Sequence, residues 1–329
     1  MKSNRKKKVH RDKNGREFIK ETYFVGGKMK FRRIYVIDGI PPDEFYERNA
    51  TDLDFYLNGD YELMNSEKDS NNHCIVQNKN DKILKSKYAM IDSKVKEIRD
   101  FCETNSNPDI IKTYQRYFKE GYDGYGIDDK VFKHQIEFWV EQWKDEMTME
   151  SYLTLGDELM KNGRFDEKHV AISFLKSSRQ DFSKDTFNRV GVWFDYGINN
   201  WATTDVLCML VLSSLLFDKI IDFNDLKSWI DSESEWKRRA VPVALIELDK
   251  LTKDLKSIEA IELVEPLMLD DSEYVQKGIG TLLRGLWKKY PSQIEDFLMK
   301  WKDKCGRLII QYSTEKMDKE YRKKFSRIK

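Results

Sequence analysis

The chain has 329 residues, of which 40% are hydrophobic and 13% aromatic, so it can bury a sizeable core. Its longest apolar run, at residues 206–217, is shorter than the roughly 20 residues of a membrane-spanning helix, and no leading segment resembles a signal peptide. Four scattered cysteines and four histidines give no metal-ligand spacing. We therefore expect a cytoplasmic protein with reduced thiols, no membrane contact, no metal and no cofactor.

Charge is strongly segregated, although the net charge is only +1. Residues 1–33 contain 13 Lys or Arg against 3 Asp or Glu, a balance of +10, and residues 284–329 contain 14 against 6, a balance of +8. The middle of the chain therefore carries −17. Clustered cations favour a polyanion partner, because they release counterions from phosphates. A solvated tail and a charged last helix would give the same pattern.

The N-terminal part of the chain is predicted to lie outside the main core. Residues 1–20 begin with a stretch too polar to pack and are expected to form a basic mobile tail, followed at residues 21–85 by an extension and linker. Within the extension, aromatic and β-branched residues flank Gly26 and Gly27, which predicts a β-hairpin. Residues 65–82 are rich in Asn, Ser and Asp and are the best linker candidate.

Residues 86–329 are predicted to be helical throughout. Apolar residues recur at steps of three and four, with Asp or Ser near the starts of the segments and Asn, Gly or Pro near their ends. Short helices joined by polar breaks are typical of an α-solenoid of HEAT-like helix pairs. No clean sequence period is present, so an irregular α-domain stays the alternative.

The stretch "NNWATTDVLC" contains the first candidate site. Trp201 and Asp205 are four residues apart in a predicted helix, so their side chains share one face. The alternative is that Trp201 packs in the core and Asp205 favours the amino-terminal end of its helix.

Two further helices carry basic side chains. In the helix predicted at residues 272–290, a stripe separate from the apolar face contains Lys277, Thr281, Arg284 and Lys288. This stripe is a candidate anion-binding surface, with an ordinary solvent face as the alternative.

In "SEWKRRAVPVALI", Trp236, Arg238 and Arg239 begin a helix whose first turn can hold Pro242. Guanidinium groups at a helix start suit phosphate contacts but oppose the helix dipole.

From about residue 109 onward, five stretches occur in a specific order and approximate spacing: "QRYFKEGYDGYGI", "FDEKHVAISFL", "NWATTDVL", "EWKRRAVPVAL" and "YVQKGIGTLLR". Together they resemble the HEAT-like-repeat DNA glycosylases of the AlkD type, the DNA alkylation repair enzymes. The resemblance implies a curved solenoid whose concave basic face holds duplex DNA with a cationic N3- or N7-alkylated purine. It also implies excision of that base by hydrolysis of the N-glycosidic bond, with the lesion left stacked rather than flipped out. We expect the protein to be a monomer.

The family motif also implies roles for individual residues. Its Trp, Asp and Arg fall on Trp201, Asp205 and Arg239, which we expect to be the catalytic group. In that group the carboxylate stabilises the cationic sugar, the indole adds cation–π attraction, and the guanidinium holds a phosphate. The residues expected to contact DNA are Tyr117, Arg238, Lys277, Thr281, Arg284 and Lys288.

One position departs from the family pattern. A second family tryptophan aligns with Thr281, which supplies no aromatic face, and Trp287 points elsewhere on the helix. Aromatic residues of the hairpin, Tyr23, Phe24, Phe31 and Tyr35, are possible substitutes. The alternatives are a non-catalytic HEAT-repeat module for damaged, bent or branched DNA, and a helical-repeat scaffold that binds an acidic protein.

Overall fold

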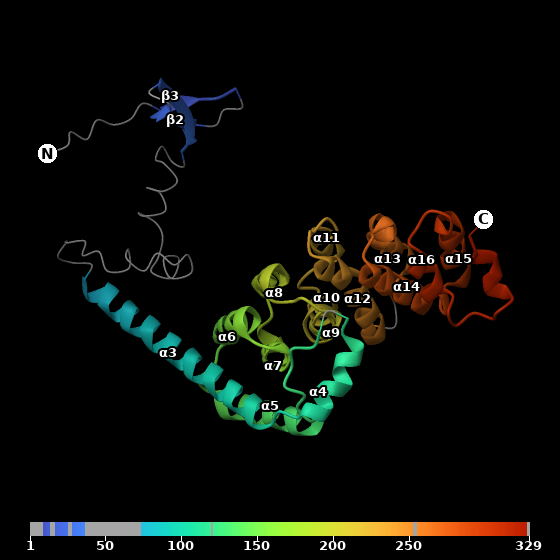
Figure 1. The fold of residues 1–329 in the computed structure, drawn as a ribbon, viewed down its shortest axis with the longest axis horizontal. Helices are drawn as coiled ribbons and strands as arrows, with labels where there is room; N and C mark the ends of the chain where they lie inside the picture. Colours follow the sequence, from blue (N-terminus) through green and yellow to red (C-terminus); the bar gives the residue numbers. More distant parts are fainter. Residues whose placement is uncertain are drawn as a thin grey trace. The chain divides into compact units, whose positions relative to one another are not determined.

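The computed structural model describes residues 9–13, 17–25, 28–36, 74–119, 121–252 and 255–327. Contacts divide the chain into two compact units, Met1–Asn80 and Asp81–Lys329. Figure 1 shows a small N-terminal sheet and a long succession of helices. No helix in the described part of the chain is both long and apolar enough to cross a membrane.

The first unit contains a three-stranded antiparallel sheet with the order β1-β2-β3. The central strand β2 (Glu17–Val25) pairs along its full length with β3 (Lys28–Tyr35), and Val25 lies opposite Lys28. This register confirms the predicted β-hairpin. The two connecting glycines lie outside the described residues.

The first strand, β1 (Val9–Arg11), lies within the tail predicted at residues 1–20, of which residues 1–8 and 14–16 lie outside the described residues. His10 lies opposite Phe18 and stacks on its ring, with the ring centroids 5.6 Å apart. The Arg11 guanidinium donates to the Glu17 carboxylate at 2.8 Å. These cross-strand contacts order a segment whose polarity alone predicts mobility.

One correction concerns the linker predicted at residues 65–82. Helix α3 (Cys74–Thr104) already includes residues 74–82, and residues 65–73 lie outside the described part. No Gly or Pro interrupts α3, so its polar beginning can remain helical. Further along α3, Ile91, Val95, Ile98 and Cys102 are buried at steps of four and three.

The second unit is an α-solenoid of helix pairs, as predicted. After α4 (Pro108–Tyr114) and α5 (Asp129–Trp143), the helices follow one another along the chain in successive twos: α6 (Met149–Asn162) and α7 (Phe165–Ser177), α8 (Lys184–Tyr196) and α9 (Trp201–Leu207), α11 (Phe223–Lys227) and α12 (Glu235–Thr252), α13 (Ser257–Val264) and α14 (Glu273–Trp287), and α15 (Pro291–Trp301) and α16 (Arg307–Ser313). Helix α9 continues through a π-helical turn (Cys208–Leu212) into α10 (Ser213–Phe217).

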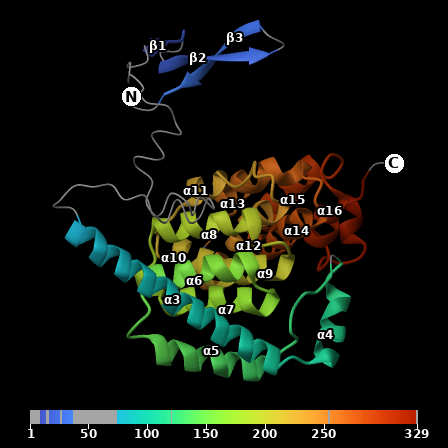
Figure 2. The same ribbon diagram turned by 60° about the vertical axis from the view of Figure 1, so that its left-hand side comes forward.

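The second helices of these pairs form one layer. Helix α7 contacts α9, α9 contacts α12, α12 contacts α14, and α14 contacts α16. On the other side, α6 contacts α8 and α13 contacts α15. Figure 2 shows the same succession from a second direction. Residues of α9, α12 and α14 that are far apart in the sequence are therefore neighbours in one layer.

Helix α14 shows how the pattern produces this packing. Ser272 caps the helix by accepting hydrogen bonds from the backbone of Tyr274 and Val275. The predicted apolar face is confirmed, because its members are 0–2% exposed: Ile279, Leu282, Leu283 and Leu286. Burying such side chains contributes about 1.5–3 kcal/mol each.

The position of Pro242 differs from the prediction. Helix α12 begins at Glu235, so Pro242 lies beyond its second turn rather than in the first. Its ring packs where α12 crosses α14, and a Cβ added to Gly278 would lie only 3.2 Å from the Pro242 Cγ. The two helices therefore approach closely here, which brings Arg239 to the start of α14.

Candidate active site

A paired carboxylate and guanidinium join α9 to α12. Arg239 donates from Nε to Asp205 Oδ1 at 2.9 Å and from Nη2 to Asp205 Oδ2 at 2.8 Å, which is a two-pronged ion pair. Its Nη1 donates to the Tyr274 carbonyl on α14 at 2.6 Å. The Arg239 side chain is 11% exposed and that of Asp205 is 33% exposed. The guanidinium is thus buried, while part of the carboxylate stays accessible.

The sequence did not indicate that Arg239 binds the Asp205 carboxylate. The sequence analysis assigned its guanidinium to a DNA phosphate, whereas here three of its five N–H groups bind the protein. Burial raises the pKa of Asp205 above its ordinary value, and the charge and hydrogen bonds of Arg239 act in the opposite direction. The arrangement fixes the orientation of the Asp205 carboxylate on α9, close to the beginnings of α12 and α14.

Trp201 lies one turn before Asp205, as their spacing predicts. It is the first residue of α9, and the Asn200 side chain caps this helix by accepting from the Thr203 backbone at 2.9 Å. The Trp201 indole stacks on Phe118, with centroids 5.6 Å apart and an interplanar angle of 22°. Phe118 was missed by the sequence analysis, although it directly follows the candidate Tyr117.

The segment that contains Phe118 connects α9 to α14. Trp201 Nε1 donates to the Tyr117 carbonyl at 3.3 Å, while the Tyr117 side chain is 65% exposed. Lys119 forms an ion pair with Glu273, the first residue of α14. The segment at residues 117–119 is therefore held between the start of α9 and the start of α14, and it leaves the Tyr117 ring exposed.

The basic stripe of α14 is less cationic than its sequence indicates. Lys277 donates to the Glu273 carboxylate at 2.7 Å, and Arg284 forms an ion pair with Glu315 at 2.5 Å. Thr281 is partly exposed between them. Lys288 is exposed, and it forms no ion pair with the described residues of 81–329.

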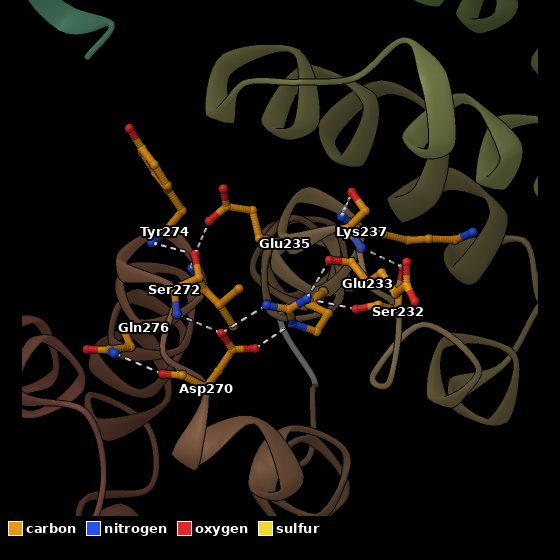
Figure 3. A network of polar contacts seen from close by, with 11 residues as sticks. Ser232, Glu233, Glu235, Lys237, Asp270, Ser272, Tyr274 and Gln276 are labelled. Atoms are coloured by element: carbon orange, nitrogen blue, oxygen red, sulfur yellow. Dashed lines mark hydrogen bonds and ion pairs between the residues drawn. The ribbon is translucent and has the colours of Figure 1, made fainter. Parts of the chain in front are cut away.

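Arg238 belongs to a structural network instead of an open surface. Figure 3 shows this network, with Ser232, Glu233 and Asp270 labelled. Arg238 donates to the Asp270 carboxylate from Nε at 2.6 Å and from Nη2 at 3.2 Å, and Nη1 donates to the carbonyls of Ser232 and Glu233. Asp270 also accepts from the Ser272 backbone at 2.8 Å. Arg238 thus ties α12 to the segment before α14, and this geometry gives no support to its expected contact with DNA.

A histidine lies on the α7 side of the same layer. The His169 ring contacts Phe165, with centroids 4.1 Å apart, and His169 Nε2 lies 3.4 Å from the Thr203 Oγ1 on α9. Burial lowers the pKa of His169 to about 4, and the positive charge of Lys168 acts in the same direction. His169 is therefore neutral at physiological pH.

Because the pKa of His169 is lowered, we expect the protein to lose stability in acid. Between its ordinary pKa of 6.5 and its folded pKa of about 4, the unfolded chain binds one proton more than the folded protein. The stabilisation that comes from the neutral His169 is complete above pH 6.5 and is lost as the pH falls to about 4. The free energy of unfolding decreases by about 3 kcal/mol at most. Urea unfolding at neutral pH and near pH 4 should show a smaller loss for His169→Gln than for the wild type. Equal losses would show that His169 does not titrate abnormally.

The fold is thus a helical-repeat solenoid with a fixed carboxylate on one layer. Among the described residues, no group of three His, Cys, Asp or Glu side chains could hold a metal ion. The family model described as "DNA alkylation repair enzyme" matches residues 98–317. The chain therefore belongs to the DNA alkylation repair enzyme family, and its role is in the repair of alkylated DNA.

One solved structure supports the same fold, and two others are similar with lower TM-scores. A predicted DNA alkylation repair enzyme from Enterococcus faecalis is 16% identical with a TM-score of 0.56, covering 65% of this chain and 98% of its own. AlkD2 from Streptococcus mutans is 20% identical with a TM-score of 0.45, covering 64% and 98%. The protein smu.31 from Streptococcus mutans UA159 is 22% identical with a TM-score of 0.44, covering 57% and 93%. No curated protein matches the sequence significantly.

Proposed function

We propose that this protein is a DNA glycosylase that removes cationic N3- or N7-alkylated purines from duplex DNA. The observation that carries the proposal is the Asp205 carboxylate, which Arg239 fixes in place while a third of it stays accessible beside Trp201. Membership of the DNA alkylation repair enzyme family supports DNA as the partner. The test is release of free base from a duplex that contains 7-methylguanine.

The proposed chemistry follows from where charge develops. As the N-glycosidic bond breaks, its electron pair moves to the purine nitrogen and neutralises the alkylated base, while the sugar becomes cationic. A fixed carboxylate in a partly dry site stabilises that sugar more than the ground state. Asp205 in its ionised form also orients the attacking water and accepts its proton. A cationic base is a good leaving group, so the reaction needs no strong general acid.

The remaining site residues have supporting roles in this proposal. The Trp201 indole shields the sugar from solvent and adds cation–π attraction of about 0.5–2 kcal/mol. Arg239 positions the carboxylate, and one N–H on each of its two terminal nitrogens remains for a phosphate beside the lesion. Tyr117, Lys277, Arg284 and Lys288 are proposed to contact the DNA backbone.

A non-catalytic DNA-binding module is the second candidate. Thr281 stands where the family pattern has its second tryptophan, and Phe118 already covers one face of the Trp201 indole. Such a module would bind duplex DNA with strong salt dependence and release no base. Its DNA affinity would be unchanged by Asp205→Asn.

Lys288 provides a test of the DNA-binding layer. Replacing this exposed lysine of the α14 stripe by alanine should weaken duplex binding for all sequences and reduce the slope of log K against log salt by about 1. Lys304→Ala removes an exposed lysine in the connection between α15 and α16, outside the α14 stripe, and should leave the slope unchanged. Equal effects of the two variants would place the DNA elsewhere.

A further inference from the structure

The sheet of the first unit, whose three strands are labelled in Figure 2, exposes large side chains on one face. In an antiparallel pair, residues opposite one another share a face, and so do residues two apart along a strand. The register of β2 and β3 therefore places the following exposed side chains on the same face, which we call the open face: Lys20, Thr22, Met29, Phe31, Arg33 and Tyr35.

The open face differs from the opposite face in what it leaves accessible. The Phe31 side chain is 60% exposed, and Met29 is exposed to a similar extent. On the opposite face Ile19 lies across from Ile34 and is only 2% exposed. An antiparallel sheet needs one buried face to be stable, so the apolar side chains of the open face are available to a partner.

Contacts within the sheet order the side chains at one end of the open face. The Tyr35 hydroxyl donates to the Asp12 carboxylate at 3.1 Å, and the Tyr35 ring meets the Phe18 ring edge-on, with centroids 6.0 Å apart. The Arg33 guanidinium lies over the same Phe18 ring, 5.0 Å from its centroid. Side chains that are already ordered lose little conformational freedom when a ligand binds.

Charge on the sheet favours an anionic partner. Residues 9–13, 17–25 and 28–36 contain seven Lys or Arg against three Asp or Glu, and β3 alone contains four Lys or Arg and no acidic residue. On the open face Lys20 lies directly opposite Arg33, next to Phe31. Like charges in this position destabilise a sheet, unless an anion binds between them. Two copies of this chain would repel each other here, so a second copy does not suit the open face.

We propose that the open face binds single-stranded DNA, with a base stacked on Phe31 and a phosphate held between Lys20 and Arg33. Exposed rings beside cations are typical of surfaces for unpaired strands, because rings stack on bases and cations follow the phosphates. The bases of a duplex are stacked on one another and offer Phe31 no free face. DNA is the expected strand because the family repairs alkylated DNA. This site is additional to the proposed duplex site of the second unit.

Fluorescence anisotropy with the full chain and a labelled oligothymidylate of about 12 nucleotides measures this binding. Phe31→Leu keeps an apolar side chain but removes the ring, and it should weaken binding by about fivefold or more. Phe31→Tyr keeps a ring and should bind like the wild type. The matched control is Phe138→Leu, which removes a 52% exposed ring on α5 and should also bind like the wild type.

Two exposed lysines on paired strands test the role of charge. Lys20→Ala should reduce the slope of log K against log salt by about 0.7, the value for one phosphate contact on a single strand. Lys30 lies on the opposite face of β3, so Lys30→Ala should leave the slope as it is in the wild type. The same reduction in both variants would contradict a phosphate site on the open face.

The binding assay can be interpreted whether or not the protein releases a base. Failure of the oligothymidylate to bind, or wild-type affinity of Phe31→Leu, would overturn the proposal without affecting the proposed glycosylase. An equal loss of affinity of Phe31→Leu for an undamaged duplex would also overturn it, because a duplex has no free base for the ring. Tighter binding of oligouridylate than of oligothymidylate would assign the open face to RNA instead.

Discussion

Replacing Asp205 by asparagine should slow the release of 7-methylguanine from duplex DNA by about 100- to 1000-fold. Asparagine has nearly the same shape and keeps one oxygen for the Arg239 guanidinium, but it removes the charge that stabilises the cationic sugar. DNA affinity should change little, because phosphate contacts dominate it. Single-turnover base release and a parallel binding assay give the two readouts.

The control for this variant is Glu262→Gln, which removes an exposed carboxylate on α13. It should release base at the wild-type rate. Equal release by Asp205→Asn and the wild type would contradict the catalytic role, and no release by either would favour the non-catalytic module. Acid should act on the wild type as the substitution does. Because burial raises the pKa of Asp205, activity should fall with decreasing pH before an ordinary aspartate would be protonated.

The helical architecture could be predicted from the sequence because it depends on local patterns. The steps of three and four in α14 place its apolar residues on one face, and the polar breaks between helices mark their ends. The apolar run at residues 206–217 contains a π-helical turn directly after α9. Such a turn is set by packing rather than by local preference.

The candidate site was predicted in part. The spacing of Trp201 and Asp205 was sufficient to place them on adjacent turns of one helix. The pairing of Asp205 with Arg239 was not predictable in the same way, since the two are 34 residues apart and meet only because adjacent helices pack in one layer. Patterns within one helix contain no information on that crossing.

Other polar contacts had signals that the sequence analysis did not use. Glu273 precedes Lys277 by four residues, a spacing that favours an ion pair on a helix. Counting Lys277 as a free cation therefore overstated the positive charge of the stripe. Arg238 differs, because its partner Asp270 lies 32 residues away and outside its helix.

Replacing Arg239 by methionine should destabilise the second unit by about 3 kcal/mol, at the lower end of values for broken buried ion pairs. The substitution leaves the Asp205 carboxylate without its counter-charge and the Tyr274 carbonyl without a donor. Because Asp205 is 33% exposed, water can partly solvate it, which limits the cost. Urea unfolding of the full chain measures the effect, and adding Asp205→Asn should recover part of the loss.

The chain offers a matched control in Arg179. It donates to Asp218 in the same two-pronged geometry, with both distances 2.8 Å, but its side chain is 39% exposed. Exposed pairs contribute little, so Arg179→Met should cost less than about 1 kcal/mol. A similar cost for both variants would mean that burial adds nothing to the Asp205 pair. Arg239→Met also removes the guanidinium that opposes the effect of burial on the pKa of Asp205, so any remaining activity should decline at a higher pH than in the wild type. An unchanged pH profile would show that Arg239 does not influence the ionisation of Asp205, and it would contradict the proposed role of Arg239 in catalysis.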